Sequence, residues 1–197
     1  DPGLTQEQRV KFTGVALDKA RRLEELLGEF FDITRMDLDS DPEERHPIQL
    51  SMLLEQLADE FYPLFAEKQL RYQVDIQHHL VVLGDPDKIA RVFDNVLRNA
   101  VSYSVPGGQV EVRAQKAGNR AEVVIRNEGL EIPEGELANI FRKFYRLDAA
   151  RSSRTGGAGL GLAIAKEIVE RHGGEIRAES NGRITSFTIT LPLYEEE

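Results

Sequence analysis

The sequence contains no cysteine among its 197 residues, so disulfide bonds and thiolate chemistry are both excluded. Basic residues are fewer than acidic ones: 25 Lys and Arg against 34 Asp and Glu give a formal net charge of −9. That balance argues against a nucleic-acid-binding surface as the main function. No apolar run approaches membrane-spanning length, and no signal peptide begins the chain. The first residues, Asp-Pro-Gly, include no initiator Met, and we expect the chain to be a piece of a longer protein.

The N-terminal part has the pattern of a helix. Residues 4–38 contain no proline and predict one long helix with Thr5 as its N-cap. Small and apolar residues recur along it at alternating spacings of four and three, which is typical of a helical-bundle seam: Ala16, Ala20, Leu23, Leu27, Phe30 and Thr34. The seam either packs against its own domain or belongs to a dimeric bundle whose other helix lies outside this chain.

A polar stretch containing Pro42 ends this region and predicts a domain boundary. We divide the chain into a helix (1–40), a linker (41–46), a folded domain (47–193) and an acidic tail (194–197).

The folded domain contains short strand patterns and amphipathic helix patterns. Strands are predicted at 47–50, 70–76 (half-buried), 81–83, 109–116, 121–126, 175–179 and 185–191. Ser51 is predicted to cap a helix over 52–67, and Asp85 with Pro86 to start a helix that reaches Tyr103. Two glycines end a further helix over 159–172. Because strands and helices segregate rather than alternate strictly, we expect an α+β fold built as a two-layer sandwich.

Several amides stand at positions that suit a ligand. Asn95 and Asn99 lie four residues apart on one predicted helix and therefore share a face at the edge of its apolar stripe. Asn is a poor helix former, so two of them there need an explanation; amide oxygens suit Mg²⁺ and amide N–H groups suit phosphate. Two ordinary surface amides are the alternative. Further on, a strand runs into Asn127 and Gly129, which places Asn127 where a base edge can be read.

A basic stretch and a glycine run follow. Residues 142–154 form the most basic segment of this acidic chain, next to the aromatic pair Phe141 and Phe144. Cations there suit a triphosphate, although a basic cluster by itself is usually a solvated face. Four glycines within residues 156–161 then lead directly into a helix. Glycine lets backbone N–H groups approach a ligand closely, and the helix N-terminus adds donors and a positive dipole end. The run therefore predicts a phosphate cradle.

Taken in order, the Asn pair, Asn127 with Gly129, the Phe pair and the glycine run resemble the N, G1, F and G2 boxes of sensor histidine kinases. Residues 17–35 are similar to the second helix of that family's dimerisation domain, and their details, with residues 144–153, are similar to vancomycin-resistance sensor kinases. The resemblance implies the fold shared with gyrase, Hsp90 and MutL, in which helices cover one face of a mixed sheet.

The resemblance also implies an activity. A protein-histidine kinase of this kind binds ATP and Mg²⁺ and passes the γ-phosphoryl group to a histidine on a separate helix, for relay to an aspartate of a response regulator. The family further implies a homodimer formed through the N-terminal helix, and a cytoplasmic domain whose parent protein is anchored in the bacterial membrane.

By resemblance, Asn99 and Asn95 would hold Mg²⁺, and a mobile lid over about residues 147–157 would cover the phosphates. The implied ATP-binding set is Asn95, Asn99, Tyr103, Asn127, Gly129, Ile132, Phe144, Arg146, Arg151, Gly157, Gly159, Leu160, Gly161 and Leu162.

Three residues depart from the family pattern. Asn127 stands where the motif usually has an Asp that accepts from the adenine amino group; an amide oxygen still accepts, at a loss of about 1 kcal/mol. Glu131 replaces the second glycine of that motif and should stiffen the turn. Ser102 stands where many members carry a phosphate-contacting Lys.

The four histidines (His46, His78, His79 and His172) stand outside the sequence context of the family's phosphoacceptor. We therefore expect the acceptor on a helix outside this chain, and no autophosphorylation in cis. Two alternatives stay open. One is an ATPase of the same fold, which we expect to be slow because Asn95 stands where those enzymes place a water-activating Glu. The other is a nucleotide-free dimerisation or response-regulator-docking module whose site has decayed at Asn127 and Glu131.

Overall fold

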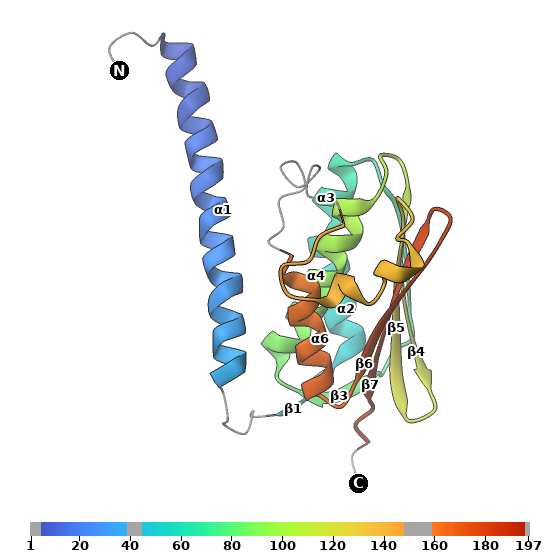
Figure 1. Ribbon diagram of the computed structural model, residues 1–197. Helices are drawn as coiled ribbons and strands as arrows, with labels where there is room; N and C mark the ends of the chain where they lie inside the picture. Colours follow the sequence, from blue (N-terminus) through green and yellow to red (C-terminus); the bar gives the residue numbers. More distant parts are fainter. Residues whose placement is uncertain (1–4, 39–44, 148–158, 196–197) are drawn as a thin grey trace. The chain divides into compact units, whose positions relative to one another are not determined.

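The computed structural model describes residues 5–38, 45–147 and 159–195 (Figure 1). The chain forms two compact units, Asp1–Ser40 and Asp41–Glu197. The first unit holds helix α1 (Gln6–Leu38). Thr5 Oγ1 accepts from the N–H of Gln8 at 3.2 Å, and Gln8 Oε1 accepts from the N–H of Thr5 at 3.0 Å. This capping box confirms Thr5 as the N-cap.

Helix α1 leaves its described apolar side chains in solvent. Leu23 and Leu27, two members of the predicted seam, are 57% and 48% exposed. Burying such side chains contributes roughly 1.5–3 kcal/mol each, so α1 gains little of that stabilisation within its own unit. None of the described helices is both long enough and apolar enough to cross a membrane.

The second unit is built on a five-stranded mixed sheet with the order β2-β4-β5-β7-β6. Its strands are β2 (Arg71–Ile76), β4 (Gln109–Ala117), β5 (Arg120–Glu128), β6 (Glu175–Asn181) and β7 (Ile184–Pro192). Only the β2–β4 pairing is parallel among these neighbours. The strands predicted at 109–116 and 121–126 are confirmed as β4 and β5, which form a hairpin whose two-residue turn pairs Ala117 with Arg120.

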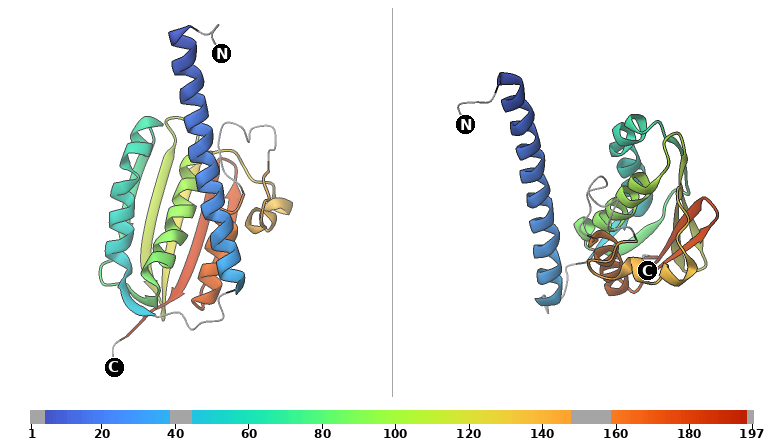
Figure 2. Two further views of the ribbon diagram at one scale, coloured as in Figure 1. Left: turned by 90° about the vertical axis from the view of Figure 1, so that its left-hand side faces the viewer. Right: turned by 45° about the horizontal axis from the view of Figure 1, so that its top comes forward.

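Three helices cover one face of this sheet (Figures 1 and 2). They are α2 (Leu50–Glu60), α4 (Pro86–Tyr103) and α6 (Gly161–Arg171). Strands β5 and β7 alternate between buried and more exposed residues, as a sheet with one covered face requires. A small antiparallel pair, β1 (His46–Gln49) with β3 (Val81–Gly84), lies outside the main sheet. The predicted α+β two-layer fold is confirmed.

Two local predictions were wrong. Ser51 does not cap a helix: α2 begins at Leu50, and Ser51 is buried inside it, where its Oγ donates to Gln77 O at 2.8 Å and accepts from the N–H of Leu80 at 3.0 Å. The predicted helix 52–67 is also divided at Phe61 into α2 and α3 (Tyr62–Glu67), which begins with a proline in its first turn. Tertiary hydrogen bonds to the β2–β3 connection decided the role of Ser51.

Strand β2 was expected to be half-buried, but it is exposed along almost its whole length. It is an edge strand, paired on one side with β4. Alternation of apolar and polar residues predicts a strand, but it does not say whether neighbouring elements cover the apolar face.

Candidate functional site

Helix α4 carries the amide pair predicted from the sequence. Asp85 caps the helix, with Oδ1 accepting from the N–H groups of Asp87 and Lys88 at 3.0 and 3.2 Å. The apolar stripe is buried and sets the rotation of the helix, which leaves Asn95 and Asn99 half-buried at its edge. Asn95 Nδ2 is buried and has no hydrogen-bond partner among the described residues. A buried donor without a partner lowers stability by about 1–3 kcal/mol. A bound ligand that accepts from Asn95 Nδ2 would remove this cost.

The start of α6 faces Asn95. A Cβ on Gly161 would lie 2.9 Å from Asn95 Oδ1, so a glycine here permits the close approach of the helix end to α4. No described side chain caps α6, and the first N–H groups of a helix have no partner within it. Leu160 and Leu162 are buried, at 2% and 9% exposure. Their side chains therefore anchor the helix start in the core, and only their main chain can face a ligand.

The end of α4 meets the end of β5. Asn127 is the second-to-last residue of β5 and is 2% exposed. Gly129 follows and forms an isolated β-bridge with Ser104. A Cβ on Gly129 would lie 2.4 Å from the carbonyl oxygen of Tyr103 and 3.0 Å from Asn127 Nδ2, so only a glycine fits. The structure thus brings Asn127, Gly129 and the half-exposed Tyr103 together, and their role in adenine binding stays a prediction.

The loop after Gly129 is tied to the turn between β6 and β7. The N–H of Gly129 donates to Arg183 O at 2.7 Å, and the N–H of Ile132 donates to Ser180 Oγ at 2.9 Å. Glu131 Oε1 accepts from the N–H of Gly182 at 3.2 Å. The carboxylate at this position therefore adds a contact that a glycine does not have, which agrees with the expected stiffening.

Most of the predicted lid, residues 148–157, lies outside the described residues, but the described residues on either side of it lie against each other. The N–H of Phe144 donates to Gly159 O at 2.9 Å. Gly159 has a φ of +75°, and a Cβ there would lie 2.7 Å from Tyr145 O and 3.2 Å from Arg146 Cγ. Phe144 also has a positive φ, 66°, and its side chain is 65% exposed. The described residues that flank 148–158 are therefore in direct contact.

The aromatic pair of the sequence is separated in space. The Phe141 ring packs edge-on against Phe187, with centroids 6.4 Å apart, and Lys166 Nζ lies 6.0 Å from the same ring. Phe144 instead faces solvent. Two predicted site residues lie within 148–158, outside the described residues: Arg151 and Gly157.

The sequence motifs missed a hydrogen bond between Tyr145 and Glu136. The Tyr145 hydroxyl donates to Glu136 Oε2, which also accepts from Asn139 Nδ2 at 2.8 Å. The hydrogen bond from Tyr145, followed by that from Asn139, holds the pKa of Glu136 below its ordinary value, and the bond to Glu136 raises the pKa of Tyr145. The short 3-10 turns η1 (Glu134–Glu136) and η2 (Asn139–Phe141) bring these groups together. The spacing of the sequence motifs does not predict the hydrogen bond between Tyr145 and Glu136.

The histidines differ in their surroundings. His172 is 3% exposed; its Nδ1 lies 2.7 Å from Ile168 O, and its Nε2 accepts from the N–H of Asp85 at 3.3 Å. The Nδ1 contact lies within α6, whereas the Nε2 contact joins the end of α6 to Asp85 at the start of α4, so both ring nitrogens are occupied. The other three, His46, His78 and His79, are exposed.

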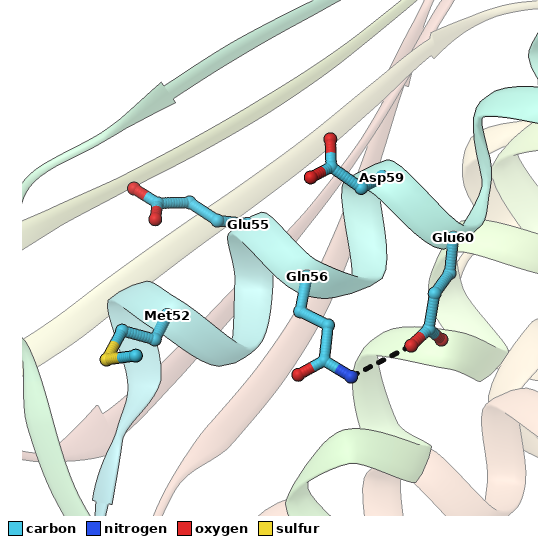
Figure 3. Close-up of a pocket in the computed structure, with 5 residues that line it drawn as sticks. All are labelled: Met52, Glu55, Gln56, Asp59 and Glu60. Atoms are coloured by element: carbon cyan, nitrogen blue, oxygen red, sulfur yellow. Dashed lines mark hydrogen bonds between the residues drawn. The ribbon is translucent and has the colours of Figure 1, made fainter.

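A shallow surface depression lies over α2, away from the residues named above (Figure 3). Its lining is Met52, Glu55, Gln56, Asp59 and Glu60, with Gln56 Nε2 donating to Glu60 Oε1 at 2.9 Å. Three carboxylates repel a polyphosphate, and no predicted site residue lies there. The depression is not the candidate site.

These features define the class of the protein. The chain belongs to the histidine kinase-, DNA gyrase B- and HSP90-like ATPase family, whose model matches residues 84–195. That range contains the amide pair, the Gly129 turn and the start of α6. The expected family is confirmed, and the chain carries an ATP-binding catalytic domain of the histidine kinase type.

Within this family the chain is similar to sensor kinases. It is 47% identical over 191 residues to the sensor protein VanS of Enterococcus faecium, covering 97% of this chain and 50% of the relative. The mycobacterial sensor histidine kinase MprB matches with a TM-score of 0.66 and 30% identity over 77% of this chain and 99% of that chain. Histidine kinase ThkA, solved in complex with the response regulator TrrA, shares the fold, with a TM-score of 0.77 and 21% identity over 97% of this chain and 53% of that one. The chain spans about half the length of the curated relatives it matches.

Proposed function

We propose that this chain binds ATP with Mg²⁺ against α4, the Gly129 turn and the start of α6, and donates the γ-phosphoryl group to a histidine outside the chain. One observation carries the proposal. The buried Asn95 amide, whose Nδ2 has no described partner, faces the glycine that begins α6. An amide and a helix N-terminus that converge in this way suit a phosphate group and its counterion.

Each part of the pocket has its own task. Asn127 offers an amide oxygen to the adenine amino group, Gly129 leaves room at the turn, and Tyr103 offers a half-exposed ring to the base. The first N–H groups of α6, at the positive end of its dipole, stabilise phosphate charge. Phosphoryl transfer depends mainly on positioning and charge neutralisation, so the chain needs no nucleophile of its own.

The donor set fits Mg²⁺. Asn99 and Asn95 present neutral amide oxygens on one face of α4, and Mg²⁺ favours a small number of protein oxygens together with water and phosphate oxygens. When bound, the ion supplies positive charge to the β- and γ-phosphates. The two amides hold and orient the phosphates from the side of α4.

The phosphoryl acceptor is proposed to lie on another helix of the full protein. His172 is buried with both ring nitrogens occupied, so it is not available for transfer. During transfer the bond between Pγ and the β–γ bridging oxygen breaks as a bond from Pγ to the imidazole nitrogen forms, and ADP leaves. We further propose that the parent protein dimerises through the region of α1, is anchored in a membrane, and passes the group to a response regulator; the ThkA–TrrA complex supports that last partner.

Calorimetric titration with ATP, with and without Mg²⁺, tests the site. Asn99→Ala should weaken Mg²⁺-dependent binding about tenfold or more, because a bond to a charged group contributes roughly 1.5–3 kcal/mol. Gln56→Ala, which removes a surface amide of α2, is the matched control and should bind as the unaltered chain does. Absence of Mg²⁺-dependent heat at millimolar nucleotide would instead favour a docking module with a decayed site.

Transfer is tested with labelled ATP and the histidine-bearing helical segment of the full protein. Acid-labile label on that segment is the expected outcome. Binding without any transfer refutes kinase activity for this chain. Rapid steady-state release of phosphate by the chain alone identifies an ATPase, despite the lack of a basic side chain at Asn95.

A further inference from the structure

Lys68 makes a contact that no motif of the site includes. It follows α3 directly and is half-buried. Its Nζ donates to the carbonyl oxygens of Val101 and Ser102 at 2.6 and 2.8 Å. Both carbonyls belong to the last turn of α4, the helix that carries Asn95 and Asn99. One ammonium group, from a residue 33 positions earlier in the chain, therefore binds two main-chain acceptors of the helix end.

The last turn of α4 depends on groups from outside the helix. The final four carbonyls of a helix have no partner within it, and α4 has no basic residue in its last turn. Ala100 O accepts from the N–H and the hydroxyl of Ser104 at 3.0 and 2.7 Å. Lys68 serves the next two carbonyls, and its positive charge also complements the negative end of the helix dipole. Lys68 is half-buried at this contact, and that burial lowers its pKa.

Lys68 is itself held firmly. Its N–H donates to Leu64 O at 3.3 Å, and its carbonyl accepts from the N–H of Gly107 at 3.2 Å. Gln69, the next residue, has a φ of 55° and turns the chain into β2, where the N–H of Arg71 donates to Gly108 O at 2.9 Å. Main chain and side chain thus join the α3–β2 corner to the segment that follows α4.

The turn that Lys68 holds forms one wall of the nucleotide site. Tyr103 O is the atom that a Cβ on Gly129 would meet at 2.4 Å, and Ser104 pairs with Gly129. The N–H of Val105 donates to Glu128 O at 2.9 Å. A shift of the last turn therefore changes the distance between Tyr103 and Asn127, the two groups assigned to the base.

We propose that Lys68 is a positioning residue of the nucleotide site: by binding the carbonyls of Val101 and Ser102 it sets the last turn of α4 against the Gly129 turn, and so determines the affinity for the adenine ring. The inference rests on the function proposed above. Lys68 acts through α4 and does not touch the nucleotide. Substitutions that act through such intermediate contacts change binding by about 0.5–2 kcal/mol, which corresponds to about a 2- to 30-fold change in affinity.

The test compares Lys68→Met, which keeps the length of the side chain and removes its donors, with Lys68→Arg, which keeps the charge and several donors. Lys116→Met is the matched control, because Lys116 Nζ bonds Glu195 at 3.0 Å on the exposed surface of β4. Calorimetry measures the dissociation constants for a non-hydrolysable ATP analogue and for the matching GTP analogue, both with Mg²⁺. Far-ultraviolet circular dichroism and thermal unfolding establish that each variant is folded.

We expect Lys68→Met to lose 2- to 30-fold in ATP-analogue affinity and part of its preference for the ATP analogue over the GTP analogue, with Lys68→Arg and Lys116→Met close to the unaltered chain. General destabilisation does not alter the preference between bases, so equal losses for both nucleotides overturn the proposal. Unchanged binding by folded Lys68→Met also overturns it, as does failure of Lys68→Arg to restore binding. If Lys68→Met does not fold, the same titrations on Lys68→Gln test the proposal, with the same expected and contradicting results. Lack of nucleotide binding by the unaltered chain would refute the proposed function itself, which is a distinguishable outcome.

Discussion

The contact between Gly129 and the end of α4 provides the sharpest prediction. In Gly129→Ala, the new Cβ would lie 2.4 Å from Tyr103 O and 3.3 Å from Tyr103 C. Both atoms are main chain, so no side-chain rotation relieves the overlap. Cβ atoms essentially never approach closer than 3.0 Å, and the two segments must therefore separate by more than half an ångström. The pairing with Ser104 and the hydrogen bond to Arg183 O resist that separation.

Forcing an extra methyl group into a well-packed position costs about 1–3 kcal/mol. In a domain of this size each kcal/mol lowers the Tm by about 2–4 °C, so Gly129→Ala should melt about 2–12 °C below the unaltered chain. ATP affinity should fall as well, because the shift moves Asn127 away from Tyr103. Gly135→Ala is the matched control, since no atom lies within 4 Å of a Cβ at that position, and its Tm and affinity should stay unchanged.

Thermal unfolding followed by circular dichroism and calorimetric titration with ATP and Mg²⁺ measure the two effects. A Gly129→Ala chain that unfolds at the same temperature as the unaltered one contradicts the close approach of α4 to this turn. A variant that melts at a lower temperature but binds ATP with unchanged affinity would show that the contact between Gly129 and α4 stabilises the domain without affecting nucleotide binding.

Three further predictions concern single groups. Asn127→Asp should raise ATP affinity about fivefold, the equivalent of about 1 kcal/mol, because a charged acceptor forms a stronger hydrogen bond with the adenine amino group. Unchanged affinity in a titration would show that Asn127 does not contact the base. Ser51→Ala should lower the free energy of unfolding by about 1–3 kcal/mol, because the buried N–H of Leu80 loses its acceptor; denaturant unfolding measures it, and no loss contradicts the bond. Tyr145→Phe should lower stability at neutral pH, and its difference from the unaltered chain should shrink in acid. The pKa of Glu136 is lowered by folding, so its contribution is complete above its ordinary pKa and disappears as pH falls through the lowered value. A difference that is constant from pH 7 to strong acid would exclude this pairing.

Much of the local structure follows from short stretches of sequence. Asp85 and Pro86 carry the start signals of α4 next to its apolar stripe, and the helix begins where these signals predict. Gly118 permits the tight turn between β4 and β5. The spacing of Asn95 and Asn99 places them on one helix face whatever the rest of the chain does. These features depend on residues within one or two turns of each other, which is why they can be read without a structure.

Tertiary structure decided the roles of residues whose partners lie far along the chain. Ser51 has the chemistry of a helix cap, yet its hydroxyl binds the β2–β3 connection instead. Phe141 and Phe144 are close in sequence, but Phe141 is half-buried against Phe187, whereas Phe144 lies in solvent. The sequence does not distinguish Lys68 from a surface lysine. Only the packing of α4 brings the carbonyls of Val101 and Ser102 to its ammonium group. A side chain's donors and acceptors are known from its identity, but their partners are set by how the helices pack on the sheet, and that packing is a property of the whole domain.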